Sequence, residues 1–233
     1  MSERSHRDEG AADGIRRSDL RTLAAHASYA SKLSTLDSDA SDVTIRPASA
    51  SLERHPSVDA WGDTACDEES RALAAEWDRL HRVSTRDPQR IRLAMEFVYR
   101  FSHAGSAVLS VLRPNESGHL DCEWQVVCGE LAEHEGDGTP RKFGPCGLCL
   151  DAGYPMFMSR PEEKFDYLRR IQPPMFETLI IPLYSERGAE LGTCWVTHHD
   201  PAARFNINDV NILERASGYL ARSLSPPLPA GRR

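Results

Sequence analysis

ETLIIPLY at Glu177–Tyr184 and ELGTCWVTH at Glu190–His198 are the stretches that decide the fold of this 233-residue chain. Both are rich in β-branched and large apolar residues, and the turn around Gly188 is short enough to join two antiparallel strands. We therefore predict a β-hairpin. A second hairpin is predicted from Gly105–Leu112 and Asp121–Leu131, because the turn cluster PNESG lies between them.

Helical patterns lie on both sides of these hairpins. Apolar residues recur every three to four positions in three segments, at 69–83, 88–101 and 206–224. Asn206 is placed to cap the last of these helices, and Asp209 follows in its first turn. Between the hairpins we expect a short strand at Pro155–Met158 and a short helix at Pro161–Ile171. Helices at both ends of an antiparallel sheet indicate an α+β domain.

Composition divides the chain into three parts. Leu, Ile, Val and Phe make up 9 of the first 68 residues but 38 of the remaining 165. A segment so poor in large apolar side chains cannot offset the entropy of ordering its backbone. We predict a disordered tail at 1–68, a folded domain at 69–224 and a flexible, Pro-rich tail at 225–233.

Charge and hydropathy exclude several classes of protein. The formal net charge of −7 offers no basic surface for nucleic acid. We see no apolar run long enough for a membrane span, no secretory signal in the first residues, and no Gly-rich phosphate loop. A reducing cytoplasm is therefore the expected location, and the six cysteines are expected to be free thiols.

The second hairpin and the segment after it also carry a family resemblance. The pattern consists of a strand that ends in Pro182-Leu183, a next strand that opens with Leu191-Gly192, and Phe205 and Asp209 before a closing helix. This pattern is similar to that of a GAF domain, a ligand-sensing module related to PAS domains. Gly147–Met158 is similar to the Gly-rich segment of that family. The resemblance covers residues 75–224. It implies a sheet with the terminal helices on one face and a lid of loop and short helix on the other.

The resemblance also implies a function. Trp195–Asp200 looks most like the GAF domains that precede bacterial sensor histidine kinases, yet these 233 residues contain no phosphoacceptor helix and no ATP-binding domain. We expect a stand-alone sensory module, without catalysis of its own, that binds a small molecule and signals through its helices to a separate protein. GAF pockets accept cyclic nucleotides, bilins, haem or amino acids, so the ligand and any cofactor stay open. The absence of a Cys-His pair argues against a bilin.

The pocket is expected beneath a lid made of the Gly144–Gly153 loop and the Pro161–Ile171 helix. The candidate pocket residues are Cys146, Gly147, Cys149, Phe157, Trp195 and His198. Each also has a plain structural interpretation: the cysteines as small buried side chains, the aromatics as core, and His198 as a polar residue at a strand end.

The PCGLC motif at 145–149 allows a chemical role as well. If Cys146 opens a helix, backbone N–H groups would stabilise its thiolate, and Cys149 would make the pair a redox couple. The alternative function is therefore a cysteine-based redox sensor. An enzyme similar to the free methionine-(R)-sulfoxide reductases, which resemble GAF domains, is a further option. Cys146-Gly147 matches one Cys-Gly position of that family, but Arg169–Phe176 lacks its catalytic cysteine.

Zinc is the remaining option for these thiols. Cys122 and Cys128 are predicted to share one face of their strand and, with Cys146 and Cys149, would supply four sulfur ligands. Strand residues six apart are roughly 20 Å from each other, so one ion cannot reach both. We therefore predict no metal site.

The terminal helices carry more apolar residues than one packed face requires. Leu93, Phe97, Ile212 and Tyr219 lie off the main stripes. Either the three helices cover one another or a second chain covers them. GAF domains commonly pair through such helices, so we predict a homodimer.

Overall fold

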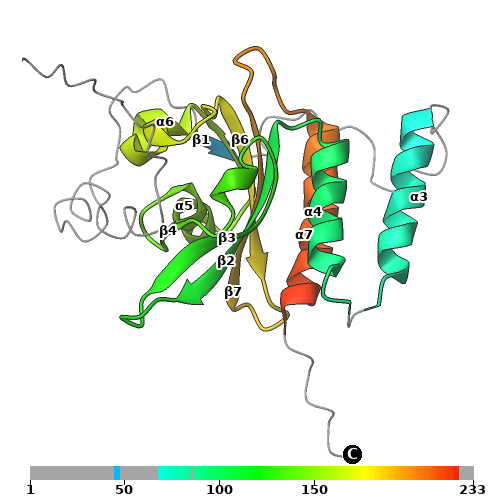
Figure 1. Cartoon of the computed structure of the whole chain (residues 1–233), viewed down its shortest axis with the longest axis horizontal. Coiled ribbons are helices and arrows are strands. Elements are labelled where there is room, and N and C mark those ends of the chain that lie inside the picture. The colour runs from blue at the N-terminus through cyan, green and yellow to red at the C-terminus, as the bar shows by residue number, and fades with distance from the viewer. Residues whose placement is uncertain (1–44, 48–67, 85–86, 226–233) are drawn as a thin grey trace, which may run out of the picture.

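The computed structural model describes residues 45–47, 68–84 and 87–225. Within them, seven strands form one antiparallel sheet in the order β1-β5-β6-β7-β2-β3-β4 (Figure 1). The strands are β1 (Ile45–Pro47), β2 (Ser106–Pro114), β3 (Leu120–Gly129), β4 (Gly138–Pro140), β5 (Met156–Ser159), β6 (Glu177–Tyr184) and β7 (Glu190–His198). Both predicted hairpins are present, as β2–β3 and β6–β7, and they pair with each other through β2 and β7.

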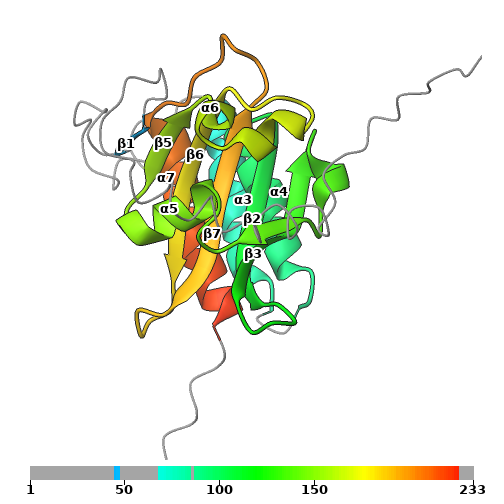
Figure 2. The same ribbon diagram turned by 90° about the vertical axis from the view of Figure 1, so that its left-hand side faces the viewer.

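Helices cover both faces of this sheet. They are α3 (Glu68–Arg82), α4 (Arg90–Phe101), α5 (Pro145–Ala152), α6 (Pro161–Lys164) and α7 (Ile207–Leu224), with short 3-10 helices η3 (Ala132–His134) and η4 (Asp166–Arg170). Figure 1 shows α4 and α7 against one face, with α3 outside α4; Figure 2 shows α5 and α6 in front of the other face. We call α5, α6 and η4 the lid. The predicted α+β architecture is confirmed.

The alternation of side chains along the strands separates two cores. On β6, Leu179 and Ile181 point to α4 and α7, whereas Ile180 between them points to the lid. On β7, Val196 belongs to the helix-side core and Trp195 to the lid-side core. Both cores are built from buried apolar side chains, so the sheet is covered on both faces.

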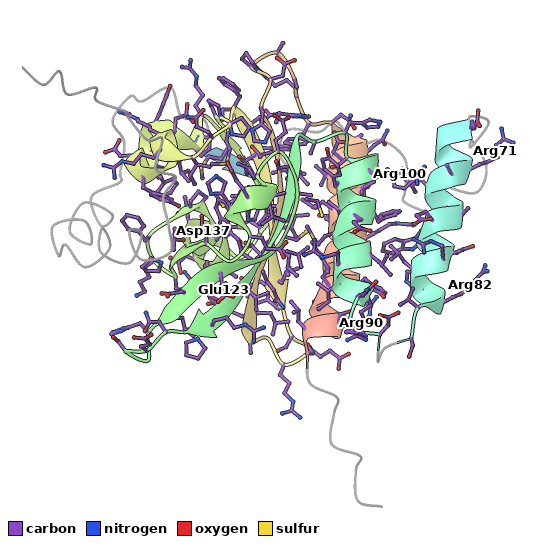
Figure 3. The ribbon with its side chains drawn as sticks, viewed as in Figure 1. Arg71, Arg82, Arg90, Arg100, Glu123 and Asp137 are labelled. Atoms are coloured by element: carbon purple, nitrogen blue, oxygen red, sulfur yellow. The ribbon has the colours of Figure 1, made fainter. Side chains whose placement is uncertain are left out.

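The helix α3 covers the outer side of α4 and α7. The centroid of the Trp77 ring lies 5.2 Å from that of Phe97 and 6.4 Å from that of Tyr219. In addition, Tyr219 Oη donates a hydrogen bond to Leu80 O at 3.4 Å. Arg90, at the start of α4 in Figure 3, donates to Ser223 O of α7 at 2.6 Å. Of the residues from which we predicted a homodimer, Phe97 and Ile212 are thus buried within one chain, whereas Leu93 and Tyr219 are partly buried.

The cap of α7 forms as predicted. Asn206 Oδ1 accepts the backbone N–H groups of Asn208 and Asp209, while Asp209 Oδ2 accepts the N–H of Asn206 at 2.8 Å. This reciprocal pair satisfies donors that a helix start otherwise leaves unpaired. In α4, by contrast, Asp87 accepts the N–H of Gln89 in a turn just before the helix.

The hairpin β2–β3 corrects one expectation about the cysteines. Its register shifts at Leu109 and Ser110, which face Val126 and Trp124, so Gln125 is an extra residue on β3. A bulge of this kind reverses the alternation of faces that follows it. The Cys122 side chain therefore lies in the lid-side core and that of Cys128 in the helix-side core, although we expected both on one face.

Three short elements differ from the sequence prediction. The expected loop after β3 contains η3 and β4, and the expected lid loop at Gly144–Gly153 is mostly the helix α5. In the expected N-terminal tail, β1 pairs with β5 at the edge of the sheet. The rest of that tail, at 1–44 and 48–67, and residues 226–233 lie outside the described residues. No described helix has the length and hydropathy that crossing a bilayer requires.

Candidate functional site

A hollow lies between the lid and the sheet. Its empty volume is about 330 Å³, including solvent at its mouth. Side chains from the strands form its floor and those of the lid its roof. Among those lining it are Trp124, Thr139, Cys146, Tyr167, Ile180 and Trp195. The lining is mainly aromatic and aliphatic, and it contains no Asp, Glu, Lys, Arg or His.

Two indole rings and the Thr178 hydroxyl belong to the floor, and the buried hydroxyls of Ser110 and Thr193 lie on the neighbouring strands behind it. Trp195 Nε1 donates to Ser110 Oγ at 3.0 Å, which satisfies the one polar group of this ring. The rings of Trp124 and Trp195 meet edge to face, with centroids 5.1 Å apart. The floor is therefore mainly apolar, with few polar atoms.

The start of α5 is fixed to the sheet through Arg141. This guanidinium donates to Gly147 O at 2.9 Å, to Asp151 Oδ1 at 2.7 Å and to the Glu190 carboxylate of β7 at 2.8 and 2.9 Å. At Gly147 the helix passes so close to the preceding chain that a Cβ would lie 1.8 Å from Arg141 O. Only glycine allows this approach. The first turn of α5 is thus held against the hollow.

Cys146 lies in this first turn, directly after Pro145, as the sequence allowed. Its Sγ is 3.6 Å from Ser110 Oγ, and its thiol also interacts with that of Cys122 on β3. The hydrogen bond from Cys122 lowers the pKa of Cys146, and the Thr193 and Ser110 hydroxyls act in the same direction, while burial opposes them. Cys146 is therefore the described cysteine whose surroundings favour the thiolate.

Comparisons with known proteins agree on the architecture. No family model and no curated protein matches the sequence. Among solved structures, the GAF domain of the Acinetobacter phosphoenolpyruvate-protein phosphotransferase matches with a TM-score of 0.52 at 14% identity, over 66% of this chain and 90% of that one. The GAF domain of the corresponding protein from Coxiella burnetii matches with a TM-score of 0.52 at 12% identity, over 67% and 92%. This chain has the GAF fold.

The same search finds an enzyme with this fold. Free methionine-R-sulfoxide reductase from Neisseria meningitidis, solved with its substrate, matches with a TM-score of 0.52 at 15% identity, over 74% of this chain and 94% of that one. Sequence identities this low establish the GAF fold and nothing about shared chemistry. The function must be argued from the side chains of this chain.

The GAF fold brings together only some of the six residues predicted for the pocket. Cys146 and Trp195 line the hollow. Gly147 lies against Arg141 beside it. Cys149 is buried beneath α5, where its Sγ is 3.5 Å from Tyr154 O and 3.6 Å from Ile180 O. Burial raises the pKa of Cys149, so this thiol is not poised to ionise with Cys146.

Phe157 and His198 lie on the other face of the sheet. Both rings stack on Phe205, with centroids 6.5 Å and 4.0 Å away, respectively. Burial lowers the pKa of His198 below its usual value. In this GAF fold they belong to the contacts between the sheet and the segment before α7, and they contribute nothing to the hollow.

Other lining residues were missed by the sequence analysis. Trp124 could have been found, because it lies two residues from Cys122 on the same strand and hence on the same face. Thr139 and Tyr167 come from β4 and η4, whose sequences carry no periodic signal. The Tyr167 ring stacks on Phe143 at 4.9 Å between centroids.

Metal binding finds no support in the ranges 45–47, 68–84 and 87–225. There, no group of three or more His, Cys, Asp and Glu side chains is arranged to hold an ion. The four sulfurs considered for zinc are divided between the two cores, with Cys128 on the far side of the sheet.

Proposed function

We propose that this protein is a sensory module that binds one small molecule in the hollow beneath the lid. The observation that carries the proposal is the hollow itself, with two crossed indole rings and a buried hydroxyl in its floor. Ligand sites of proteins are mostly apolar with a few fixed polar groups, and their volumes begin at about 300 Å³. The space open to the centre of a water molecule is only about 20 Å³ here, so the proposal requires the lid to move outward to admit the ligand.

The lining indicates the chemical class of the ligand. Burying an ion without a partner is costly, and no side chain of fixed charge lines the hollow. The ligand is therefore a small, uncharged molecule with a flat or aliphatic body for the indole rings. One or two polar atoms of the ligand would meet the hydroxyls of Thr139 and Thr178.

Signalling is proposed to pass through the sheet to the terminal helices. The lid-side residue Ile180 lies between Leu179 and Ile181, which pack in the helix-side core. A ligand that orders the lid acts on β6 and β7, the strands against which α7 packs. A separate protein that contacts α4 or α7 would then detect the bound state.

Native mass spectrometry of the purified full chain tests the proposal. We expect a mass increment from a retained small molecule, and collisional release identifies it. Leu168→Trp fills the hollow from the lid and should abolish this increment, because Leu168 lines the hollow. Arg169→Trp introduces the same ring at the adjacent exposed position and should preserve it.

A second measurement covers a ligand that is lost during purification. Intrinsic fluorescence is followed while cyclic nucleotides, amino acids and neutral aromatic metabolites are added. The background carries Trp61→Phe and Trp77→Phe, so that Trp124 and Trp195 are the two tryptophans left of four. Thermal midpoints of both lid variants confirm that each is folded. An unchanged spectrum and melting temperature with every compound, together with no retained mass, would refute ligand binding.

A further inference from the structure

Two thiols of the lid-side core interact with each other, and one of them, Cys146, lines the hollow. Cys146 lies in the first turn of α5 and Cys122 on β3, and the two thiols interact directly. Both are buried, with 5% and 1% of their surfaces exposed. They belong to different elements, 24 positions apart in the sequence. A bond between them would therefore join the lid to the sheet.

The surroundings assign different roles to the two sulfurs. Ser110 Oγ accepts the indole N–H of Trp195, so the Ser110 proton is free to point at Cys146 Sγ, 3.6 Å away. The buried Thr193 hydroxyl has no other hydrogen-bond partner among the described residues and faces the same sulfur. Cys122 holds its proton, because donating it to Cys146 raises the pKa of Cys122 well above its usual value. Cys146 is thus the nucleophile and Cys122 the thiol that attacks second.

The other described cysteines lack this arrangement. Burial raises the pKa of Cys128 to about 11 and that of Cys194 to about 12, and both lie in the helix-side core. Cys149, three residues after Cys146, is directed at backbone carbonyl oxygens. Of these five, only Cys146 lines the hollow, so an oxidant entering from solvent meets this sulfur first.

We propose that Cys122 and Cys146 form a disulfide when a small hydroperoxide enters the hollow. The Cys146 thiolate attacks the peroxide, the O–O bond breaks, and an alcohol or water leaves with a proton, which yields a sulfenic acid. Cys122 then attacks that sulfur; the S–S bond forms, the S–O bond breaks, and water leaves with the Cys122 proton. Two thiols lose two electrons in total, and one peroxide is reduced. A small dithiol reverses the bond by exchange.

With this disulfide, the attachment of the lid to the sheet depends on the redox state of the two cysteines. The bond would fix the first turn of α5 to β3 and remove the thiol that lines the hollow. The chemistry does not depend on the ligand proposed above, since it needs only the peroxide and the two sulfurs. A missing ligand would leave this proposal intact, and a missing disulfide would leave ligand binding intact.

Peptide mapping of the full chain tests the inference. The reduced protein receives one equivalent of hydrogen peroxide at neutral pH, and the remaining thiols are alkylated. Trypsin followed by chymotrypsin, which cuts after Trp124 and Leu148, separates Cys122 from Cys128 and Cys146 from Cys149. We expect a Cys122–Cys146 cross-linked peptide and the loss of two of the six thiols, restored by dithiothreitol.

Variants divide the two chemical steps. Cys122→Ser should stop after the first step, with a sulfenic acid on Cys146 that dimedone traps. Cys128→Ser, on the same strand but facing the other core, should preserve the cross-link. A Cys146–Cys149 link in the wild-type protein would overturn the proposal. The proposal would also be overturned if Cys146 stays reduced while Cys128 and Cys194 oxidise. Both of these outcomes are measured on the wild-type protein, so they do not depend on whether a variant folds.

Discussion

Trp195 donates its indole N–H to Ser110 Oγ at 3.0 Å across the β2–β7 pair, and the same oxygen lies 3.6 Å from Cys146 Sγ. One hydroxyl therefore positions an aromatic ring of the floor and supports the reactive thiol of the lid. All three residues are buried, so none of these contacts is replaced by water when one partner is removed.

Ser110→Ala should destabilise the protein by about 1–3 kcal/mol, because it leaves the Trp195 N–H buried without an acceptor. The pKa of Cys146 should also rise, since one group that favours its thiolate is lost. Urea unfolding and the pH dependence of alkylation measure the two effects. Ser102→Ala is the matched control, because the Ser102 hydroxyl is equally buried but has no hydrogen-bond partner among the described residues. Equal losses in both variants would contradict the prediction.

Gly147→Ala should damage the start of α5. Its Cβ would lie 1.8 Å from Arg141 O, so the helix or the preceding chain has to move. We expect a loss of roughly 2–4 kcal/mol in unfolding free energy, typical of severe steric damage. Gly218→Ala in α7 meets only a flexible arginine tip at 3.7 Å and should stabilise by up to about 1 kcal/mol. Similar thermal midpoints for the two variants would show that α5 tolerates displacement.

Asp209 should make the protein less stable as the pH rises from 4 to 6. Burial raises its pKa from 3.8 to about 6; the hydrogen bond from the Asn206 N–H and the charge of His103 oppose this rise, and Glu177 adds to it. The unfolded chain therefore loses this proton first, and the folded state is penalised by about 2–3 kcal/mol once both forms are ionised. Asp209→Asn keeps an oxygen for the Asn206 N–H and should remove this dependence.

The check for Asp209 is the difference in unfolding free energy between the wild-type protein and Asp209→Asn across that pH range. The difference should grow in favour of the variant as the pH rises and become constant about one pH unit above the folded-state pKa of about 6. Glu116→Gln, at an exposed loop position, serves as the control and should follow the wild-type curve. A difference that does not change with pH would contradict the assignment.

Two truncations test the edge strand. Sequence composition predicts that removing residues 1–65 leaves the core intact, but this deletion also removes β1, which pairs with β5. Removing residues 1–43 keeps β1. We expect the longer deletion to unfold a few degrees lower than the shorter one, given about 2–4 °C per kcal/mol for a chain of this size. Identical midpoints would show that β1 contributes no stability.

Light scattering over a concentration series tests the homodimer predicted from sequence. Because α3 covers Phe97 and Tyr219, we now expect the mass of one chain at tens of micromolar. Trp77→Glu should detach α3 from that face and increase self-association. A dimeric mass for the wild-type protein would support the homodimer predicted from the sequence. Its interface would then lie outside the residues that α3 covers.

Elements defined by local sequence could be predicted. The hairpins and the helices at 69–83, 88–101 and 206–224 appear within a few residues of their predicted bounds, because alternation and helical periodicity are properties of the segment itself. The strands β1 and β4 could not be predicted, since each has three residues and exists only through its partner.

The candidate site was predictable in part for the same reason. Cys146 and Trp195 were predicted for the pocket and do line the hollow. His198 could have been rejected as a pocket residue, because it lies three residues from Trp195 and a regular strand places such a pair on opposite faces. Phe157 could not be assigned, because a four-residue strand gives no face until its pairing is known. The extra residue Gln125 likewise hid the side on which Cys128 lies.

The two cores on either side of the sheet have a consequence for how this protein can change over time. Substitutions beneath the lid can alter what the hollow accepts while the packing under α4 and α7 stays as it is. The helices can likewise acquire a new docking partner without altering the hollow. Specificity and output can therefore diverge separately among descendants of this chain, with the backbone of β6 and β7 as the one part that both must keep.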